Sequence, residues 1–485
     1  MNEHKLEHPL FLFISVTLIL LTANGEYLFD PPYWDAQGGS FLQAAWLIEN
    51  SFDYLWLFHE KGYMQGGPNV YYLNIVPLLY AVFLIFIKPA LVFFILHLLN
   101  IFCTAVTCVV FYRIARSVFS SGLSVLFCFA CLLNPILSGQ TAGINMELYL
   151  LLFSALSIYC FHVGKYPLAV ILCISAYFFK SSAIILGMAY GVFYLAESVK
   201  SLLKKEKPSF PYTLCLPVFI MVILSFVSSD SDRYFSQSNL MEKISRFQEE
   251  IVHHFPDQGL ILALIIVTAV YYFFKHGLKN SFMNFLLIYT LGCYAAYSNC
   301  FWPLPRYTAS YIFPAFLCSG FLLAKTFRNQ LMAFLLFSSL SIFGMMNQHG
   351  KFLPKLHPQI SRAGANLERS REYLTDLEAN IRTCRFIENN YADAEIGVSR
   401  NFYWMLTNPF LGYVTRTVEK AFILSSDYFQ SEAFDLKNAD TLYLYAPHFI
   451  RPPELNDHFQ ILYVDQSLEG TPVVLFKKSG LTGNG

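Results

Sequence analysis

A succession of long apolar segments occupies the first 346 residues of this chain and leaves few ways for it to fold. A helix needs roughly 20 mostly apolar residues to cross a bilayer. On that criterion we expect about eleven transmembrane helices, at residues 9–27, 90–111, 121–137, 146–161, 166–179, 181–195, 212–228, 260–274, 282–297, 307–324 and 331–346. With 55% hydrophobic and only 14% charged residues, the composition excludes an ordinary soluble domain. The sequence therefore predicts an all-α polytopic membrane protein.

One further apolar segment, residues 71–87, is short and contains Pro77. If it does not cross the membrane, twelve Lys and Arg residues of the loops fall on one side and seven on the other. The positive-inside rule makes the richer side cytoplasmic. We therefore expect 71–87 to lie along the membrane surface, with the N-terminus in the cytoplasm. Residues 41–48 have an amphipathic pattern and are expected to form a second juxtamembrane helix in the same outer loop.

The composition changes at about Asn347, and the tail from there to Gly485 contains fourteen Lys and Arg residues, too many for a membrane-embedded segment. Helical periodicity extends over residues 363–390. Short strand-like runs follow at 395–398, 421–424, 441–445, 460–464 and 473–476. We expect a transmembrane domain over 1–346 and a small α/β domain over 347–485. An odd number of spans places the α/β domain outside the cytoplasm.

Charge and cysteine usage exclude several other classes of protein. The formal net charge is zero, so no basic excess indicates nucleic-acid binding. Nine of the eleven cysteines lie in apolar runs, where they act as small hydrophobes, and only Cys300 and Cys384 are expected to be accessible. The C-x-x-C pair Cys128 and Cys131 lies inside an apolar run, and no His/Cys cluster has the spacing of a zinc site, so we expect no disulfide framework and no structural metal.

The expected topology brings several charged residues to the extracytoplasmic face. The first span is followed by Asp30 and Asp35, which flank Tyr33 and Trp34, two rings of the kind that seek the membrane interface. A carboxylate near lipid is costly unless a partner or a reaction needs it. The other charged residues expected on this face are Glu147, Lys180, Asp230, Asp232 and Arg306.

Five short segments on this side, taken in order, resemble elements of a known family. They are Trp34-Asp35-Ala36, Gly66-Gly67-Pro68-Asn69-Val70-Tyr71-Tyr72, the turn from Asn134-Pro135 to Asn145-Met146-Glu147, Phe179-Lys180-Ser181, and Pro305-Arg306-Tyr307 followed by Pro314. The chain is thus similar to polyprenyl-phosphate-sugar-dependent glycosyltransferases of the GT-C superfamily, in particular the protein mannosyltransferase and lipid A aminoarabinose transferase branch. It departs from the family pattern at Gln37, Gly38 and Glu147, and it lacks the His-Pro pair.

The resemblance implies transfer of a sugar from a lipid-linked donor, a polyprenyl phosphate, to a protein, lipid or glycan acceptor at the membrane. Asp35 is then the catalytic general base. Lys180 and Arg306 bind the donor phosphate and stabilise its developing charge, while Glu147, Asp30 and Tyr307 are the other substrate-binding candidates. A lipid monophosphate leaving group does not require a divalent ion, so we expect no cofactor and no obligatory metal. The expected location is the bacterial inner membrane.

Each candidate also has a purely structural interpretation. Arg306 is then an arginine that extends to the interface, Lys180 a turn lysine that needs some anionic partner, Glu147 a helix-start acid, and Asp30 part of an Asp-Pro-Pro turn. Solvated loop acids are expected at Asp230 and Asp232, helix-packing hydrogen bonds at His97 and Asn100, and a structural role for His253-His254.

Two other functions remain open. A polytopic transporter or lipid flippase of the envelope glycan pathway is the alternative, although no charged residues populate the middle of the spans and no internal repeat is evident. The third is a noncatalytic assembly or sensor protein whose tail binds a partner.

Overall fold

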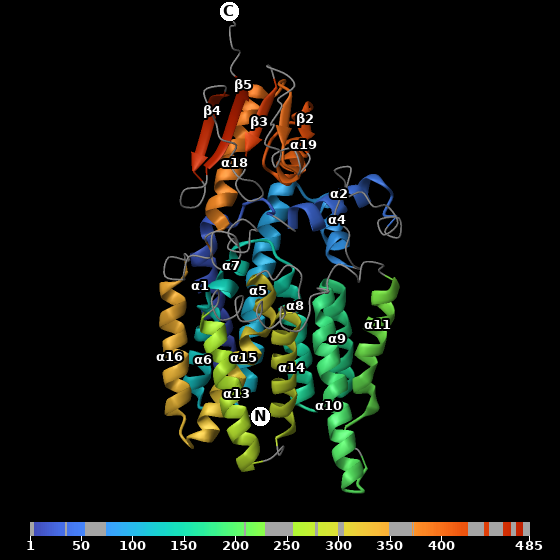
Figure 1. Ribbon diagram of the computed structural model, residues 1–485, viewed down its shortest axis with the longest axis vertical. Helices are drawn as coiled ribbons and strands as arrows, with labels where there is room; N and C mark the ends of the chain where they lie inside the picture. Colours follow the sequence, from blue (N-terminus) through green and yellow to red (C-terminus); the bar gives the residue numbers. More distant parts are fainter. Residues whose placement is uncertain are drawn as a thin grey trace, which may run out of the picture.

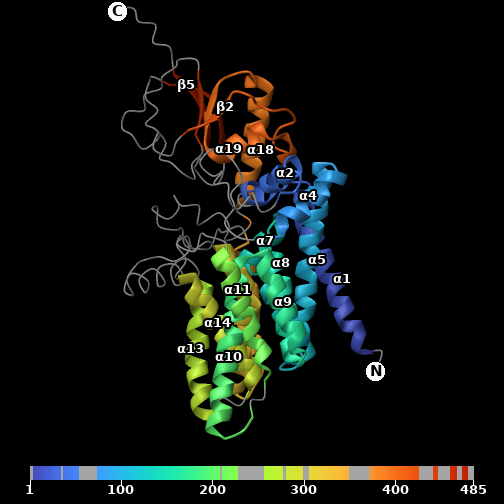
Figure 2. The same cartoon turned by 90° about the vertical axis from the view of Figure 1, so that its right-hand side faces the viewer.

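The computed structural model describes residues 4–33, 36–53, 74–207, 210–227, 256–276, 280–298, 305–348, 371, 373–424, 441–445, 459–466 and 472–478. In this part of the chain a bundle of helices lies beneath a small α/β domain (Figure 1). The N-terminus is at the end of the bundle away from that domain (Figure 2).

Each of the eleven expected spans contains a helix of the bundle within the described residues. They are α1 (His4–Asn24), α5 (Pro89–Ala115), α6 (Ser121–Leu132), α8 (Glu147–His162), α9 (Tyr166–Phe179), α10 (Ile184–Leu203), α11 (Leu216–Val227), α13 (Pro256–His276), α14 (Ser281–Ser298), α15 (Ile312–Thr326) and α16 (Leu331–Met346). Four of these regions are long and apolar enough to cross a bilayer alone, namely Pro9–Tyr27, Pro89–Ala115, Ser181–Leu203 and Arg306–Thr326. The shorter helices run beside them in the same bundle (Figure 1).

Short helices cover the end of the bundle that faces the α/β domain. They are η1 (Gly25–Tyr27), the π-helix η2 (Ala36–Phe41), α2 (Leu42–Glu49), α4 (Val76–Phe86) and α7 (Pro135–Ala142). With 11 residues, α4 reaches only about half of the ~30 Å hydrocarbon thickness. Its first turn is attached to the end of α9, because the amide of Ile75 donates to the Phe178 carbonyl at 2.8 Å. The expected juxtamembrane helices of the first outer loop are thus confirmed.

The span expected at 121–137 is broken. The helix α6 ends at Leu132, and α7 continues from Pro135 at an angle of 66°. Proline cannot donate the backbone hydrogen bond that would continue the helix. The Asn134 side chain starts the new helix by accepting from the Ile136 amide at 3.1 Å. As a result, α7 lies across the end of the bundle instead of extending the span.

The α/β domain contains α18 (Tyr373–Tyr391), α19 (Arg400–Thr407), η9 (Pro409–Leu411) and a five-stranded sheet. The strands are β1 (Ile396–Val398), β2 (Ala421–Ile423), β3 (Leu442–Tyr445), β4 (Phe459–Gln466) and β5 (Pro472–Lys478), in the order β2-β1-β3-β5-β4. The strand β1 is parallel to β2 and β3, whereas β5 is antiparallel to β3 and β4. All five expected strands are present, and α18 lies beside the sheet (Figure 2).

One accessibility prediction in this domain is wrong. Cys384, expected to be accessible, lies on the inner face of α18 with no exposed surface. Cys300 lies outside the described residues.

Hydrogen bonds attach the α/β domain directly to the bundle. Arg371 donates to the Ser138 hydroxyl at 3.1 Å, the Ala23 carbonyl at 2.9 Å and the Asn24 side chain at 2.7 Å. The Tyr373 hydroxyl donates to the Gly139 carbonyl at 2.9 Å. Further along, Tyr413 donates to the Pro32 carbonyl and Gln37 to the Asn401 carbonyl. The domain and the short end helices therefore form one packed layer.

Candidate functional site

Three charged residues from distant segments meet at this end of the bundle. The Lys180 ammonium donates a hydrogen bond to Oε1 of Glu147, and Nε of Arg306 lies 3.1 Å from the same oxygen. The side chains of Glu147 and Arg306 are 5% and 3% exposed, and that of Lys180 is 12% exposed. Two cations therefore flank one carboxylate in a place with little water.

The local fold explains how these residues come together. Glu147 is the first residue of α8, Lys180 follows the last residue of α9, and Arg306 lies in the 3₁₀ turn η8 (Pro305–Tyr311) that precedes α15. The Lys180 ammonium also lies 4.4 Å from the centroid of the Tyr307 ring, a cation–π distance. The structure thus brings together four of the site residues predicted from the sequence, and it supplies the anionic partner that Lys180 was expected to need.

Asp30 is placed differently. Its backbone carbonyl faces Nε2 of His97 at 3.2 Å. Its carboxylate lies among Glu26, Glu378 and Arg385, so it faces α18 of the α/β domain. The structure shows no contact between Asp30 and the Glu147 cluster among the described residues.

Several candidates cannot be placed. Asp35, Asp230, Asp232 and the pair His253-His254 lie outside the described residues. The described neighbours of Asp35 in sequence, Tyr33 and Ala36, both lie in the layer between the bundle and the α/β domain. Within the described ranges, no three His, Cys, Asp or Glu side chains gather as they would around a metal ion.

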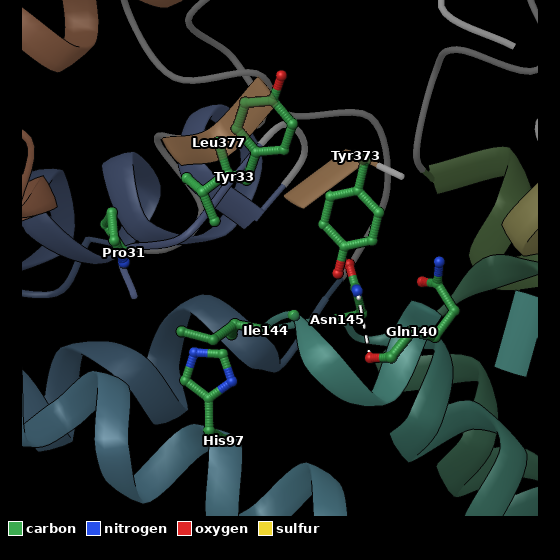
Figure 3. A pocket seen from close by; sticks show the side chains of 9 residues that line it. Pro31, Tyr33, His97, Gln140, Ile144, Asn145, Tyr373 and Leu377 are labelled. Atoms are coloured by element: carbon green, nitrogen blue, oxygen red, sulfur yellow. Dashed lines mark hydrogen bonds between the residues drawn. The ribbon is translucent and has the colours of Figure 1, made fainter. Parts of the chain in front are cut away.

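A narrow pocket lies at the junction of the bundle with α18. It is lined by Pro31, Tyr33, His97, Gln140, Gly143, Ile144, Asn145, Tyr373 and Leu377, and it is partly open to solvent. Figure 3 shows His97 of α5 on one side, with Tyr33 and Leu377 opposite and Tyr373 near Gln140. The rings of Tyr33 and Tyr373 are nearly parallel, with their centroids 6.2 Å apart.

Sequence reasoning missed this pocket almost entirely. His97 and Asn100 were expected only to pack helices. Asn100 does so by donating to the Gly143 carbonyl at 2.7 Å, whereas His97 reaches the Asp30 loop. The available signal was Gln140, an amide in the otherwise small and apolar turn after Pro135. Tyr373 and Leu377 of the pocket belong to α18, more than 200 positions away in sequence.

Comparison with known proteins gives a match in structure and none in sequence. No family model matches the chain, and no curated protein is similar to it in sequence. Among solved structures, the chain is similar to ArnT from Cupriavidus metallidurans bound to undecaprenyl phosphate, with a TM-score of 0.51 and 11% identity. The similarity covers 98% of this chain and 99% of ArnT. The chain therefore has the fold of ArnT over nearly its whole length, in agreement with the architecture that the resemblance implied.

Proposed function

We propose that this protein is an integral membrane glycosyltransferase. It moves a sugar from a polyprenyl-phosphate donor to an acceptor on the extracytoplasmic face of a bacterial inner membrane. The main support is the buried cluster of Glu147, Lys180 and Arg306, because it holds two cations side by side, the type of group that binds a phosphate. The fold agrees with this function, since ArnT was solved with undecaprenyl phosphate bound.

In the proposed reaction, an acceptor hydroxyl or amine attacks the anomeric carbon of the donor sugar. Asp35 takes the proton of the attacking group, and the bond between the anomeric carbon and the phosphate oxygen breaks. The polyprenyl phosphate leaves with the electron pair of that bond. Lys180 and Arg306 stabilise the negative charge that grows on it, while Glu147 and Tyr307 hold the Lys180 ammonium in place.

The reaction so written needs no cofactor. The leaving group is already a phosphate monoester anion once the sugar departs, and fixed cations of the protein can perform the charge stabilisation that a divalent ion performs for nucleotide sugars. We propose that the protein acts on the lipid-linked donor without a resident metal.

Incubation of the purified full-length protein with defined polyprenyl-phosphate sugars tests the proposal. We expect hydrolysis or transfer of the sugar, and Asp35→Asn should lower the rate by about 10²- to 10⁴-fold, the usual contribution of a general base. Expression and membrane insertion should not change, since Asn has the same size. Full activity of Asp35→Asn would refute the assignment of Asp35 as the base. A transporter would be expected to tolerate this substitution.

The same assay tests the phosphate contact through Lys180→Met. Glu147 keeps Arg306 as its partner in this variant, so the protein should fold, while the apparent affinity for the donor should fall by about tenfold, equivalent to about 1.4 kcal/mol. The matched control is Lys200→Met, which removes an ammonium paired with Glu197 near the far end of α10. Equal donor affinity in the two variants would exclude Lys180 from the phosphate site.

A further inference from the structure

Two buried hydrogen-bond acceptors in the pocket between the bundle and α18 have no partner among the described residues. They are Nδ1 of His97 and Oε1 of Gln140. Each of these side chains belongs to a residue that is only 1% exposed, and each lines the pocket. A buried polar atom without a partner costs about 1–3 kcal/mol, and a ligand that donates a hydrogen bond to it recovers that cost.

The contacts of His97 determine what its free nitrogen can do. Its Nε2 lies 3.2 Å from the carbonyl oxygen of Asp30, which can only accept a hydrogen bond. Nε2 therefore has the proton, and Nδ1 of the neutral ring is an acceptor. Oε1 of Gln140 is an acceptor as well. A ligand in this pocket must present at least two hydrogen-bond donors.

The lining selects among donors by charge and shape. None of the described residues that line the pocket carries a formal charge, so a ligand ammonium would be buried without a counter-ion. Neutral hydroxyl groups have no such cost. The faces of Tyr33 and Tyr373 offer apolar surface of the kind that packs against the C–H face of a sugar ring.

We propose that this pocket binds a neutral, hydroxyl-bearing sugar, with His97 and Gln140 as specificity-determining residues. The proposal rests on the glycosyltransferase function above and deepens it by naming the substrate class. The sugar belongs either to the lipid-linked donor or to a glycan acceptor, since the two present the same hydroxyl chemistry.

Gly143 provides a way to close the pocket. Its backbone, with φ −106° and ψ 175°, suits any residue. An added Cβ would however collide with the Tyr373 hydroxyl and lie 3.0 Å from Nδ2 of Asn145. Gly143→Ala should therefore narrow the pocket, whereas Gly122→Ala, where nothing lies within 4 Å of the new Cβ, is the matched control.

The test measures equilibrium binding to the full-length protein in lipid nanodiscs. The probes are polyprenyl-phosphate glucose, a polyprenyl-phosphate sugar with a free amine, sugar-free polyprenyl phosphate, and methyl glucoside. We expect the wild type to prefer glucose to the amino sugar by about tenfold. Gln140→Glu should reverse that preference, because it adds a counter-charge for the ammonium. Gln330→Glu, an exposed amide on the loop between α15 and α16, should change nothing.

Gly143→Ala should weaken both lipid-linked sugars and leave the affinity for sugar-free polyprenyl phosphate unchanged. Competition by methyl glucoside against the lipid-linked sugar would assign the pocket to the donor sugar, while simultaneous binding of both would assign it to the acceptor. The proposal is overturned if Gln140→Glu and Gly143→Ala bind every sugar as the wild type does, or if they lose sugar-free polyprenyl phosphate to the same extent.

These outcomes separate the pocket from the proposed function. Turnover of lipid-linked sugars that does not depend on Gln140 would support the glycosyltransferase function and refute the sugar pocket. If methyl glucoside binds in a way that depends on Gln140 but the protein turns over no lipid-linked sugar, the sugar pocket is supported and the glycosyltransferase function is refuted.

Discussion

Asp30 follows the first helix and has a carboxyl group that faces charged residues of the α/β domain. The pKa of its carboxyl is raised from 3.8 to about 7, chiefly by burial and then by the negative charges of Glu378 and Glu26, while Arg385 opposes the shift. A raised pKa means that the folded protein binds this proton more tightly than the unfolded chain does. The stability that the protonated form contributes is therefore complete below about pH 4 and is lost as the pH rises through about 7.

Asp30→Asn should remove this pH dependence, because the amide is neutral at every pH and keeps the backbone carbonyl that faces His97. We expect the variant to melt a few degrees above the wild type at about pH 8 and at a similar temperature at about pH 4. Thermal unfolding followed by intrinsic fluorescence across this range measures the effect. Parallel curves for the two proteins at all pH values would contradict it.

For single residues, the energetic cost of an unpaired charge near the membrane was the best guide in the sequence to the site residues. Lys180 was expected on the side of the membrane where insertion disfavours positive charge, so an anionic partner was expected, and Glu147 is that partner. Arg306 and Tyr307 join the same cluster. The pocket residues gave no such signal, because a neutral amide or a helix-packing histidine looks the same in sequence whether or not its acceptor atom has a partner.

Among the elements, α18 is the one that joins the two parts of the molecule. Its hydrogen bonds to the bundle are concentrated at its first turn, at Tyr373 and at the preceding Arg371. The middle of the helix is attached to the sheet, where Arg382 forms two hydrogen bonds to Asp465 at 2.8 and 3.0 Å. The start of α18 therefore serves docking, and its middle serves the internal stability of the domain.

Arg371→Ala should loosen the docked domain. It removes three hydrogen bonds to the bundle from a half-buried guanidinium, and we expect a loss of roughly 2–4 kcal/mol. Limited proteolysis should then cleave the variant faster in the segment that precedes α18. Arg382→Ala is the control, because its side chain is 50% exposed and its ion pair contributes at most about 1 kcal/mol. Equal protection of both variants would mean that Arg371 does not hold the domain.

Helices and strands were predictable from the sequence where a single pattern of apolar residues extends over the whole element. The spans and the five strands follow directly from the apolar pattern. The break between α6 and α7 was missed because an apolar window long enough for a span extends across Asn134-Pro135. The helix α19 was missed because its aromatic run Phe402-Tyr403-Trp404 has no strong helical preference, and packing on the sheet decides its conformation.

At the scale of the whole molecule, the N-terminus lies at one end and the α/β domain at the other (Figure 1), the arrangement that the expected odd number of spans predicts. The position at which the α/β domain docks on the bundle could not be predicted, because the contacts between them join residues up to 381 positions apart in sequence. Only the folded bundle brings the Ala23 carbonyl, the Ser138 hydroxyl and the Pro32 carbonyl to one surface.

The proposed orientation predicts which end is accessible from outside an intact cell. A membrane-impermeant maleimide should label Lys420→Cys, an exposed position in the α/β domain, and should label Lys204→Cys only after the membrane is permeabilised. The unmodified protein, most of whose described cysteines are buried, gives the background. Labelling of Lys204→Cys in intact cells would reverse the orientation and with it the proposed side of the reaction.

The two ends of the connection between bundle and domain meet. Gln348, after α16, accepts a hydrogen bond from the Arg371 amide at 3.1 Å, and its own side chain donates to the Leu133 carbonyl at 2.8 Å. The two residues that flank positions 349–370 are therefore in direct contact, and doubling the number of residues between two such fixed ends costs only about 0.6 kcal/mol. An affinity tag or a protease recognition sequence inserted between Gln348 and Arg371 should leave the interface between the bundle and the α/β domain intact. Cutting the backbone at such an insertion would leave two fragments held together by their own interface.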